Sequence, residues 1–194
     1  MIIILFAAYQ TFAQNNFEFD VTTRVGQYFP VNTKNIPADL FPDNAISPAA
    51  GFSLGYNVKN TSFFLGLEYA YLSPDKKDLF TGENINVKWQ YLGIPLYVQQ
   101  GIWKNFYLTA GATLVRQIKG YYKGVSSFPQ QEIPEYNWQA GAGYKLNDLK
   151  LSLQYSRGFS KINKSIKTGE TSSSGVTLRH QEIFLKLEYP IWKF

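Results

Sequence analysis

Period-two alternation of apolar and polar residues constrains the fold of this chain more than any other feature. It recurs in eight segments from residue 17 onward; in one of them Leu65, Leu67 and Tyr69 alternate with Gly66 and Glu68. Successive side chains of a β-strand point to opposite faces, so each segment predicts a strand with one apolar and one polar face. A single domain is sufficient for 194 residues.

The connections between these segments alternate in length. Long connections cover residues 30–47, 73–84, 119–134 and 160–174, and short ones cover 59–61, 101–105 and 147–148. Bacterial outer-membrane barrels combine short periplasmic turns with longer external loops, and an even strand number leaves both termini on the periplasmic side. The rhythm therefore predicts antiparallel neighbours in an up-and-down order, with all long loops at one end.

The volume of the apolar face indicates which face points outward. This face carries Phe, Tyr, Trp or Leu at nearly every position, and aromatic residues make up 17% of the chain. The interior of an eight-stranded barrel is only wide enough for its own side chains, so these residues cannot all point inward. We expect an all-β fold, an eight-stranded antiparallel up-and-down transmembrane β-barrel with short periplasmic turns and four long external loops. A soluble secreted lipocalin-like barrel is the alternative fold.

The N-terminal residues resemble a secretory signal. The apolar segment 2–9 is followed by Thr11 and Ala13, small residues that end before Gln14, although no Lys or Arg precedes Arg24. We therefore expect residues 1–14 to be a signal peptide whose start is either truncated or misassigned, and residues 15–194 to be the barrel domain. A buried first strand is the alternative for the N-terminal residues. The rest of the sequence contains no run of 18 apolar residues, so no membrane-spanning helix is predicted. The net charge of +5 is scattered along the chain, which argues against nucleic-acid binding.

Charged residues on the polar face are predicted to meet inside the barrel. Isolated buried charges are costly, so these groups should pair across the lumen and plug it. If the first and last strands close the barrel, Glu18 or Asp20 should lie near Lys186. A hydrated lumen and a narrow ion pore are the alternatives. The predicted lumen network comprises Glu18, Asp20, Arg24, Glu68, Lys88, Lys145, Lys186 and Glu188.

Two segments change the phase of their alternation. In the fourth, the apolar side switches from Trp89 and Tyr91 to Ile94, and the switch falls at Gly93 and Pro95. Because glycine and proline commonly mark bulges, we predict a strand bulge there. The last segment shifts at Pro190, after which Trp192 and the terminal Phe194 share a face.

Several stretches carry a resemblance to a known family. They are the signal ending at Gln14, the terminal aromatic residue, and the segments Tyr91–Leu96, Ala110–Ala112, Gly141–Tyr144 and Tyr155–Phe159. With these features the chain resembles the PorT-like outer-membrane β-barrels, small barrels mostly of unassigned function. The resemblance implies a place in the bacterial outer membrane, and it makes Phe194 the signal read by the barrel assembly machinery. It supplies no catalytic residues and no cofactor.

Few residues suggest chemistry beyond the barrel. His180, the only histidine, lies near Glu182 at the outer end of the last strand, where it could serve a lipid-A-modifying hydrolase or acyltransferase. Lysines of the last long loop could contact lipopolysaccharide phosphates; they are Lys161, Lys164 and Lys167. No ligand set for a metal or cofactor is evident. We expect a structural or loop-binding protein with no enzymatic activity, surrounded by outer-membrane lipid, whose loop partner the sequence does not identify.

Overall fold

The barrel wall consists of eight antiparallel strands. A computed structural model describes residues 16–34, 45–73, 75–77, 84–122, 134–159, 162–164, 167–168, 171–172 and 176–194. The wall strands are β1 (Phe17–Lys34), β2 (Ala45–Val58), β3 (Thr61–Leu72), β5 (Asn84–Trp103), β6 (Phe106–Tyr122), β7 (Glu135–Leu146), β8 (Leu149–Gly158) and β12 (Val176–Lys193). Each pairs with the next along the chain, and β1 also pairs with β12, which closes the sheet. The predicted eight-stranded barrel is confirmed.

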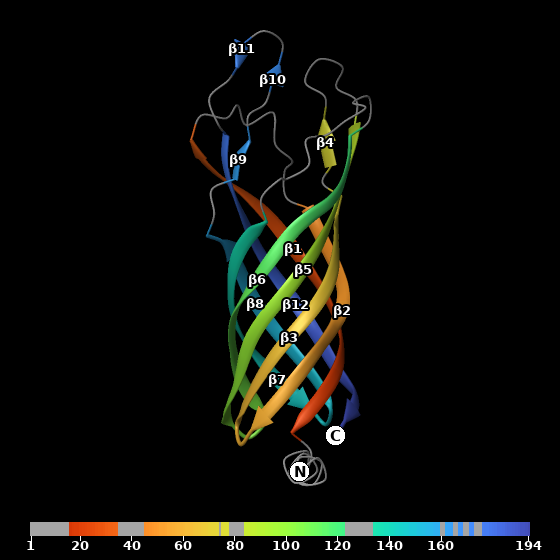
Figure 1. The fold of residues 1–194 in the computed structure, drawn as a ribbon, viewed down its shortest axis with the longest axis vertical. Helices are drawn as coiled ribbons and strands as arrows, with labels where there is room; N and C mark the ends of the chain where they lie inside the picture. The colour runs from red at the N-terminus through yellow and green to blue at the C-terminus, as the bar shows by residue number, and fades with distance from the viewer. Residues whose placement is uncertain are drawn as a thin grey trace, which may run out of the picture.

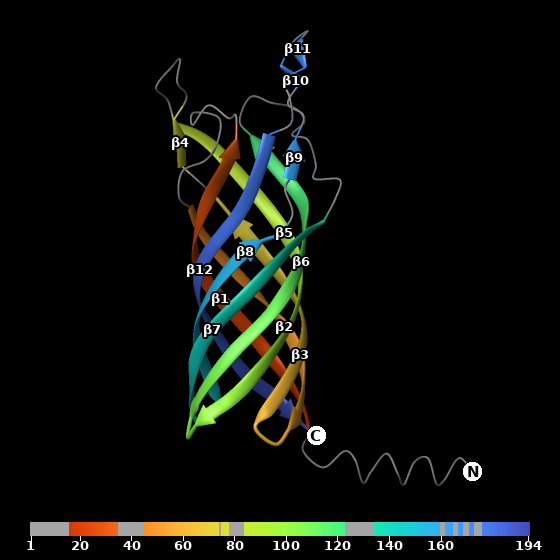
Figure 2. The same cartoon turned by 90° about the vertical axis from the view of Figure 1, so that its left-hand side faces the viewer.

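Short strands extend the sheet beyond the wall. β4 (Asp75–Lys77) pairs with β5, and β9 (Ile162–Lys164) pairs with β12. β10 (Lys167–Thr168) and β11 (Thr171–Ser172) form a separate two-stranded sheet. All four lie at one end of the barrel, and the C-terminus lies at the other (Figures 1 and 2). We call these the loop end and the turn end. The described residues contain no helix long and apolar enough to cross a membrane.

Tight turns connect the strands at the turn end. Among the described residues they are Lys59–Asn60, Lys104–Asn105 and Asn147–Asp148. The first residue of each has a positive φ, 55° at Lys59, 46° at Lys104 and 53° at Asn147. Two-residue hairpin connections need this left-handed backbone, although lysine adopts it less readily than asparagine or glycine. The short connections of the sequence are therefore tight hairpins.

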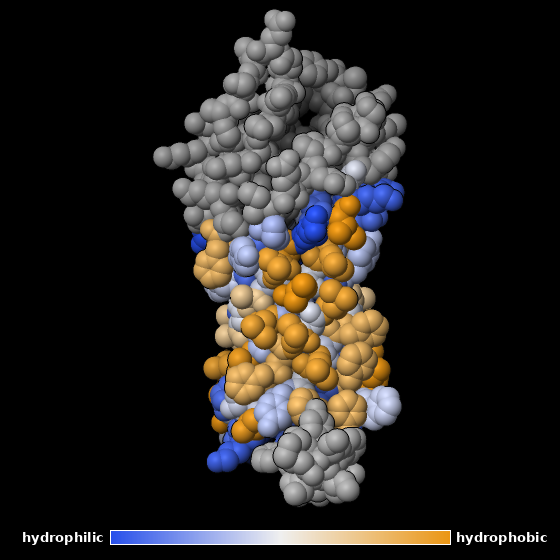
Figure 3. Space-filling model, viewed as in Figure 1, coloured by the Kyte–Doolittle hydropathy of each residue, from blue (hydrophilic) through white to orange (hydrophobic). Residues whose placement is uncertain are grey.

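The outer face of the wall is apolar. Leucines near the middle of the strands are about half exposed, with Leu65 at 53%, Leu96 at 60% and Leu153 at 59%. Figure 3 shows apolar residues across the middle of the barrel and hydrophilic residues at both edges of that region. Polar residues are buried on the opposite side of the barrel wall, with Asp20 and Glu188 at 0%. The inverted arrangement, apolar outside and polar inside, is that of a transmembrane barrel.

The predicted bulge at Gly93 and Pro95 is wrong. β5 pairs with β6 through these residues without a shift, its register with β3 is the same on either side of Ile94 and Pro95, and the irregularity lies instead opposite Gln90 and Tyr91. There Gln90 pairs with Lys119 and Tyr91 with Gln117, so the extra residue is Ile118 in β6. Inside the barrel, Trp89 packs with Tyr28 and Leu72 in a buried cluster, against which Tyr91 also packs. The apolar residues of β5 change face because this part of the lumen is itself aromatic.

The predicted phase change near Pro190 is confirmed. Phe19 pairs with Trp192 and Asp20 with Pro190, which leaves Ile191 as an extra residue in β12. Beyond this bulge Trp192 and Phe194 meet edge to face, with ring centroids 5.7 Å apart. The Phe194 backbone exchanges two hydrogen bonds of 3.0 Å with Phe17. The last residue thus completes the seam between the first and last strands.

Candidate functional site

Charged side chains meet in the turn-end half of the lumen. This inner cluster consists of Glu18, Asp20, Lys150, Lys186 and Glu188. The Lys150 ammonium donates hydrogen bonds to Glu18 at 2.5 Å and to Asp20 at 2.9 Å. Lys186 donates to Glu188 at 3.1 Å, and all five side chains are at most 6% exposed. Two ammonium groups and three carboxylates are thus removed from solvent together, which is tolerable only with close pairing.

Neutral groups complete the coordination of Glu188. The Tyr97 hydroxyl donates a hydrogen bond to this carboxylate, and the Gln99 amide donates another at 2.7 Å. Lys186 lies 3.9 Å from the centre of the Tyr97 ring, and Tyr97 stacks on Phe64 with centroids 4.9 Å apart. Tyr97 and Phe64 are each 1% exposed. The aromatic rings therefore occupy the space between the charges and contact them directly.

Glycines opposite the large rings make this filling possible. Gly111 pairs with Tyr97 across β5 and β6, and Gly55 pairs with Phe64 across β2 and β3. A Cβ atom at Gly111 would lie 2.6 Å from the Tyr97 Cα, closer than real Cβ atoms approach. The narrow lumen accepts a large ring only because the neighbouring strand has no side chain there.

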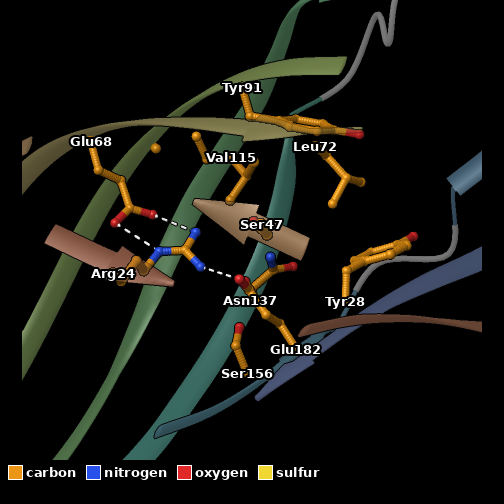
Figure 4. A pocket seen from close by; sticks show the side chains of 12 residues that line it. Arg24, Tyr28, Ser47, Glu68, Leu72, Tyr91, Val115, Asn137, Ser156 and Glu182 are labelled. Carbon is orange, nitrogen blue, oxygen red and sulfur yellow. Dashed lines mark hydrogen bonds and ion pairs between the residues drawn. The ribbon is translucent and has the colours of Figure 1, made fainter. Parts of the chain in front are cut away.

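An arginine lies between two carboxylates in the loop-end half of the lumen. Arg24 donates two hydrogen bonds to Glu68, at 3.3 Å from Nε and 3.1 Å from Nη2, and a third to Glu182 (Figure 4). Its guanidinium also lies 4.7 Å from the centre of the Phe184 ring. Such a forked contact is more specific than a single ion pair. Glu135, 1% exposed, adds a further buried carboxylate in this half.

A small cavity lies beside Arg24. Tyr28, Leu72, Tyr91 and Asn137 are among the side chains that surround its volume of about 50 Å³ (Figure 4). Each enclosed water needs roughly 10–15 Å³ of such volume, so the cavity can hold a few waters but not a metabolite. Among the described residues, no group of His, Cys, Asp or Glu is arranged to hold a metal ion.

Most of the predicted lumen residues lie in these two groups. The structure places six of the eight there: Glu18, Asp20, Arg24, Glu68, Lys186 and Glu188. Lys88 is exposed on the outer face, because its neighbours Trp89 and Tyr91 take the inward positions of β5. Lys145 is exposed at the turn-end mouth, beyond the buried part of β7. The prediction for Lys88 is wrong, whereas Lys145 pairs with Lys150 and so lies on the lumen side of β7 as predicted, but outside the buried groups.

The predicted partner of Glu18 and Asp20 is also wrong. The β1–β12 register places Lys186 opposite Arg24, and Asp20 opposite Pro190. Lys150 reaches the two carboxylates from β8, which is separated from β1 by β12. This contact crosses the lumen, so adjacent-strand register cannot reveal it.

Sequence reasoning also missed several lumen residues. They are Lys150, Glu182, Glu135, Tyr97 and Gln99. Two of them, Lys150 and Glu182, occupied polar positions of predicted strands, where the alternation alone indicates an inward side chain. Tyr97 alternates with the outward-facing Leu96, which places it on the inward side, but its aromatic residue type alone does not mark a lumen position.

Several predicted features lie outside the described residues. Residues 1–14 and Lys161 are not described, and neither are the side chains of Lys164, Lys167 and His180. Phe194 is described and is 45% exposed at the turn end.

A closed antiparallel barrel with an apolar outer band and a polar interior is an integral membrane β-barrel. Residues 1–180 match the model of the outer membrane protein beta-barrel domain, and the chain belongs to that family. Its location is the bacterial outer membrane, which rules out the soluble secreted barrel. No curated protein matches the sequence.

Solved structures with the same fold include three outer-membrane proteins. Neisserial surface protein A is 14% identical, with a TM-score of 0.58 over 88% of this chain and 96% of that one. Ail of Yersinia pestis, in complex with the heparin analogue sucrose octasulfate, is 10% identical, with a TM-score of 0.54 over 91% and 99%. AlkL is 16% identical, with a TM-score of 0.51 over 93% and 92%. At these identities the likeness concerns the fold alone.

Proposed function

We propose that this protein is a non-conducting outer-membrane barrel whose lumen is plugged by polar side chains and whose external loops carry a binding or structural role. The observation that supports the plug is the burial of the inner cluster. Asp20 and Glu188 are 0% exposed, and Phe64 and Tyr97 are 1% exposed, at the same level of the lumen. An ion would have to displace both the rings and the paired charges to pass.

Planar bilayer recording tests the plug. We expect purified wild-type protein to show no discrete conductance steps. The double variant Phe64→Ala, Tyr97→Ala removes the two rings and should produce openings, provided that it keeps the heat-modifiable gel mobility of a folded barrel. Gln100→Ala alters an exposed residue of the same strand and serves as the control. Discrete conductance by the wild type would refute the plug and favour the narrow pore.

We propose further that the loops contact phosphorylated surface glycan. Support comes from the lysine content of the last long loop, with Lys161, Lys164 and Lys167, and from the shared fold of Ail, which was solved with a sulfated polyanion. Charge reversal of the three lysines should weaken lipopolysaccharide binding by the folded barrel. Unchanged binding would contradict the loop assignment.

Phe194 and His180 carry two further predicted roles, in barrel assembly and in catalysis. The PorT-like assignment and the role of Phe194 for the assembly machinery predict that deletion of Phe194 lowers the folded fraction in the outer membrane. A rim enzyme would need His180. If the wild type modifies lipid A and His180→Ala does not, the protein has an enzymatic role instead of the proposed binding role. We favour the binding role because Glu182, the carboxylate nearest His180 in the sequence, is already paired with Arg24.

A further inference from the structure

Charge is sorted between the two faces of the barrel wall. Among the described side chains of the eight wall strands, the carboxylates all face the lumen: Glu18, Asp20, Glu68, Glu135, Glu182 and Glu188. The outward charges toward the loop end are all basic, at Lys88, Arg116, Lys119 and Arg157. Among these described side chains, the outward charge near the loop end is therefore entirely positive.

The bulge in β6 puts Lys119 on the same face as Arg116. Leu92 pairs with Arg116 and Gln90 with Lys119, and residues that pair directly share a face. Without the register shift, Ile118 would pair with Gln90, and Lys119 would pair with Trp89 and point into the lumen. Bulges commonly re-aim a side chain in this way. Arg116 and Lys119 thus stand about 7 Å apart along the outer face, as expected for two positions of a strand.

Lys88 completes the group from the neighbouring strand. It lies two positions beyond Gln90 on β5, diagonal to Lys119, and such diagonal positions are about 7–8 Å apart. Lys88, Arg116 and Lys119 are all exposed, and none has an ion pair with a described carboxylate. Long side chains at this spacing can converge on a single anionic group.

The three cations lie where the lipid headgroups of the outer leaflet begin. A transmembrane β-strand needs about 9–11 residues to cross the hydrocarbon. Counting from the aromatic residue at the turn end, Phe106 on β6, Arg116 is ten residues further along. Leu92 and Ile94, 37% and 42% exposed, lie below the cations on β5, and Tyr69, 43% exposed, pairs with Leu92 from β3. The three cations therefore adjoin an exposed apolar surface formed by Leu92, Ile94 and Tyr69.

We propose that Lys88, Arg116 and Lys119 bind a phosphate group of lipid A, the phosphorylated glycolipid of the outer leaflet. Arginine offers a forked donor pair for phosphate oxygens, and the lysines supply flexible point charges. The adjoining apolar residues would contact the acyl chains. A free anion would contact only the three cations, whereas lipid A would contact the cations with its phosphate and the apolar residues with its acyl chains. This site lies on the wall and is separate from the loop lysines of the proposed function.

Lipid retention on the folded barrel tests the site. Wild-type protein in nanodiscs is offered bis-phosphorylated lipid A, the same lipid after removal of its phosphates, and phosphatidylglycerol. The triple variant Lys88→Gln, Arg116→Gln, Lys119→Gln should bind bis-phosphorylated lipid A at least about tenfold more weakly, given the strength of basic residues at anionic membrane surfaces. The wild type should bind the dephosphorylated lipid as weakly as the triple variant binds bis-phosphorylated lipid A.

A matched variant separates the site from net charge. Lys59→Gln, Lys104→Gln, Lys145→Gln removes the same charge from exposed lysines at the turn end and should bind lipid A as the wild type does. Equal binding by the wall variant and the wild type would refute the site, and so would an equal loss in the turn-end variant. Equally tight phosphatidylglycerol binding would refute the lipid A assignment. The earlier proposals fail in different measurements. The plug fails if the wild type conducts in planar bilayers, and the loop role fails if charge reversal of the three loop lysines leaves lipopolysaccharide binding unchanged.

Discussion

Lys150 is the residue whose removal should most disturb the lumen. Its ammonium is the only described cation in contact with Glu18 and Asp20, at 2.5 and 2.9 Å. The Lys150→Met variant retains much of the side-chain volume but leaves both carboxylates buried and unpaired. Breaking a buried ion pair in this way typically costs about 3–5 kcal/mol. The three side chains are at most 6% exposed, so solvent screening reduces this value little.

Equilibrium urea unfolding of barrels refolded into lipid vesicles measures this loss, with tryptophan fluorescence as the signal. We expect Lys150→Met to lower the free energy of unfolding by about 3–5 kcal/mol. The neutral triple variant Glu18→Gln, Asp20→Asn, Lys150→Met should recover most of it, because no uncompensated charge remains. A loss below about 1 kcal/mol, the value of a hydrated surface pair, would refute the buried network and favour a wet lumen.

Three further predictions concern the outer face, the lumen packing and the turn end. Leu96→Arg should destabilise the barrel by about 2–4 kcal/mol in urea unfolding, because it places a charge near the bilayer midplane. Gly111→Ala should cost about 1–3 kcal/mol in the same assay, because the added methyl group collides with Tyr97. The hydrogen bond and positive charge from Lys193 hold the pKa of the exposed Asp148 below its usual range. The Lys193→Gln substitution should raise this pKa back toward that range, which an NMR titration measures. Because the folded-state pKa is depressed, the pair stabilises the fold above the unfolded pKa and loses this effect below about pH 4.

Each of these predictions has a matched control. Leu146→Arg places the same charge at the turn end of β7 and should have little effect, so an equal loss would contradict the assigned membrane depth. Gly101→Ala meets its nearest neighbours at 3.4 and 3.7 Å and should be tolerated. An unchanged pKa of Asp148 in Lys193→Gln would show that the ion pair does not persist in solution.

The alternation of the sequence was sufficient to predict the architecture, because side-chain direction in a strand is a local property. It identified the eight strands, the outward face and the tight turns, and it assigned most inward charges, including Arg24 and Glu188. It misassigned β5, where Trp89 and Tyr91 are apolar but inward. Residue type indicates the lipid face only where the lumen is polar, and this part of the lumen is aromatic.

Tertiary structure decided which charges meet. Glu18 on β1 pairs with Lys150 on β8, two strands away around the barrel, and that contact depends on how far the strands are staggered when the sheet closes. The position of the β6 bulge has the same origin. No local pattern marks Ile118 as a bulge, yet the register shift there places Lys119 on the outer face beside Arg116. The sequence by itself determined the two faces of every wall strand except the loop-end part of β5, whereas closure of the barrel determined which residues meet on each face.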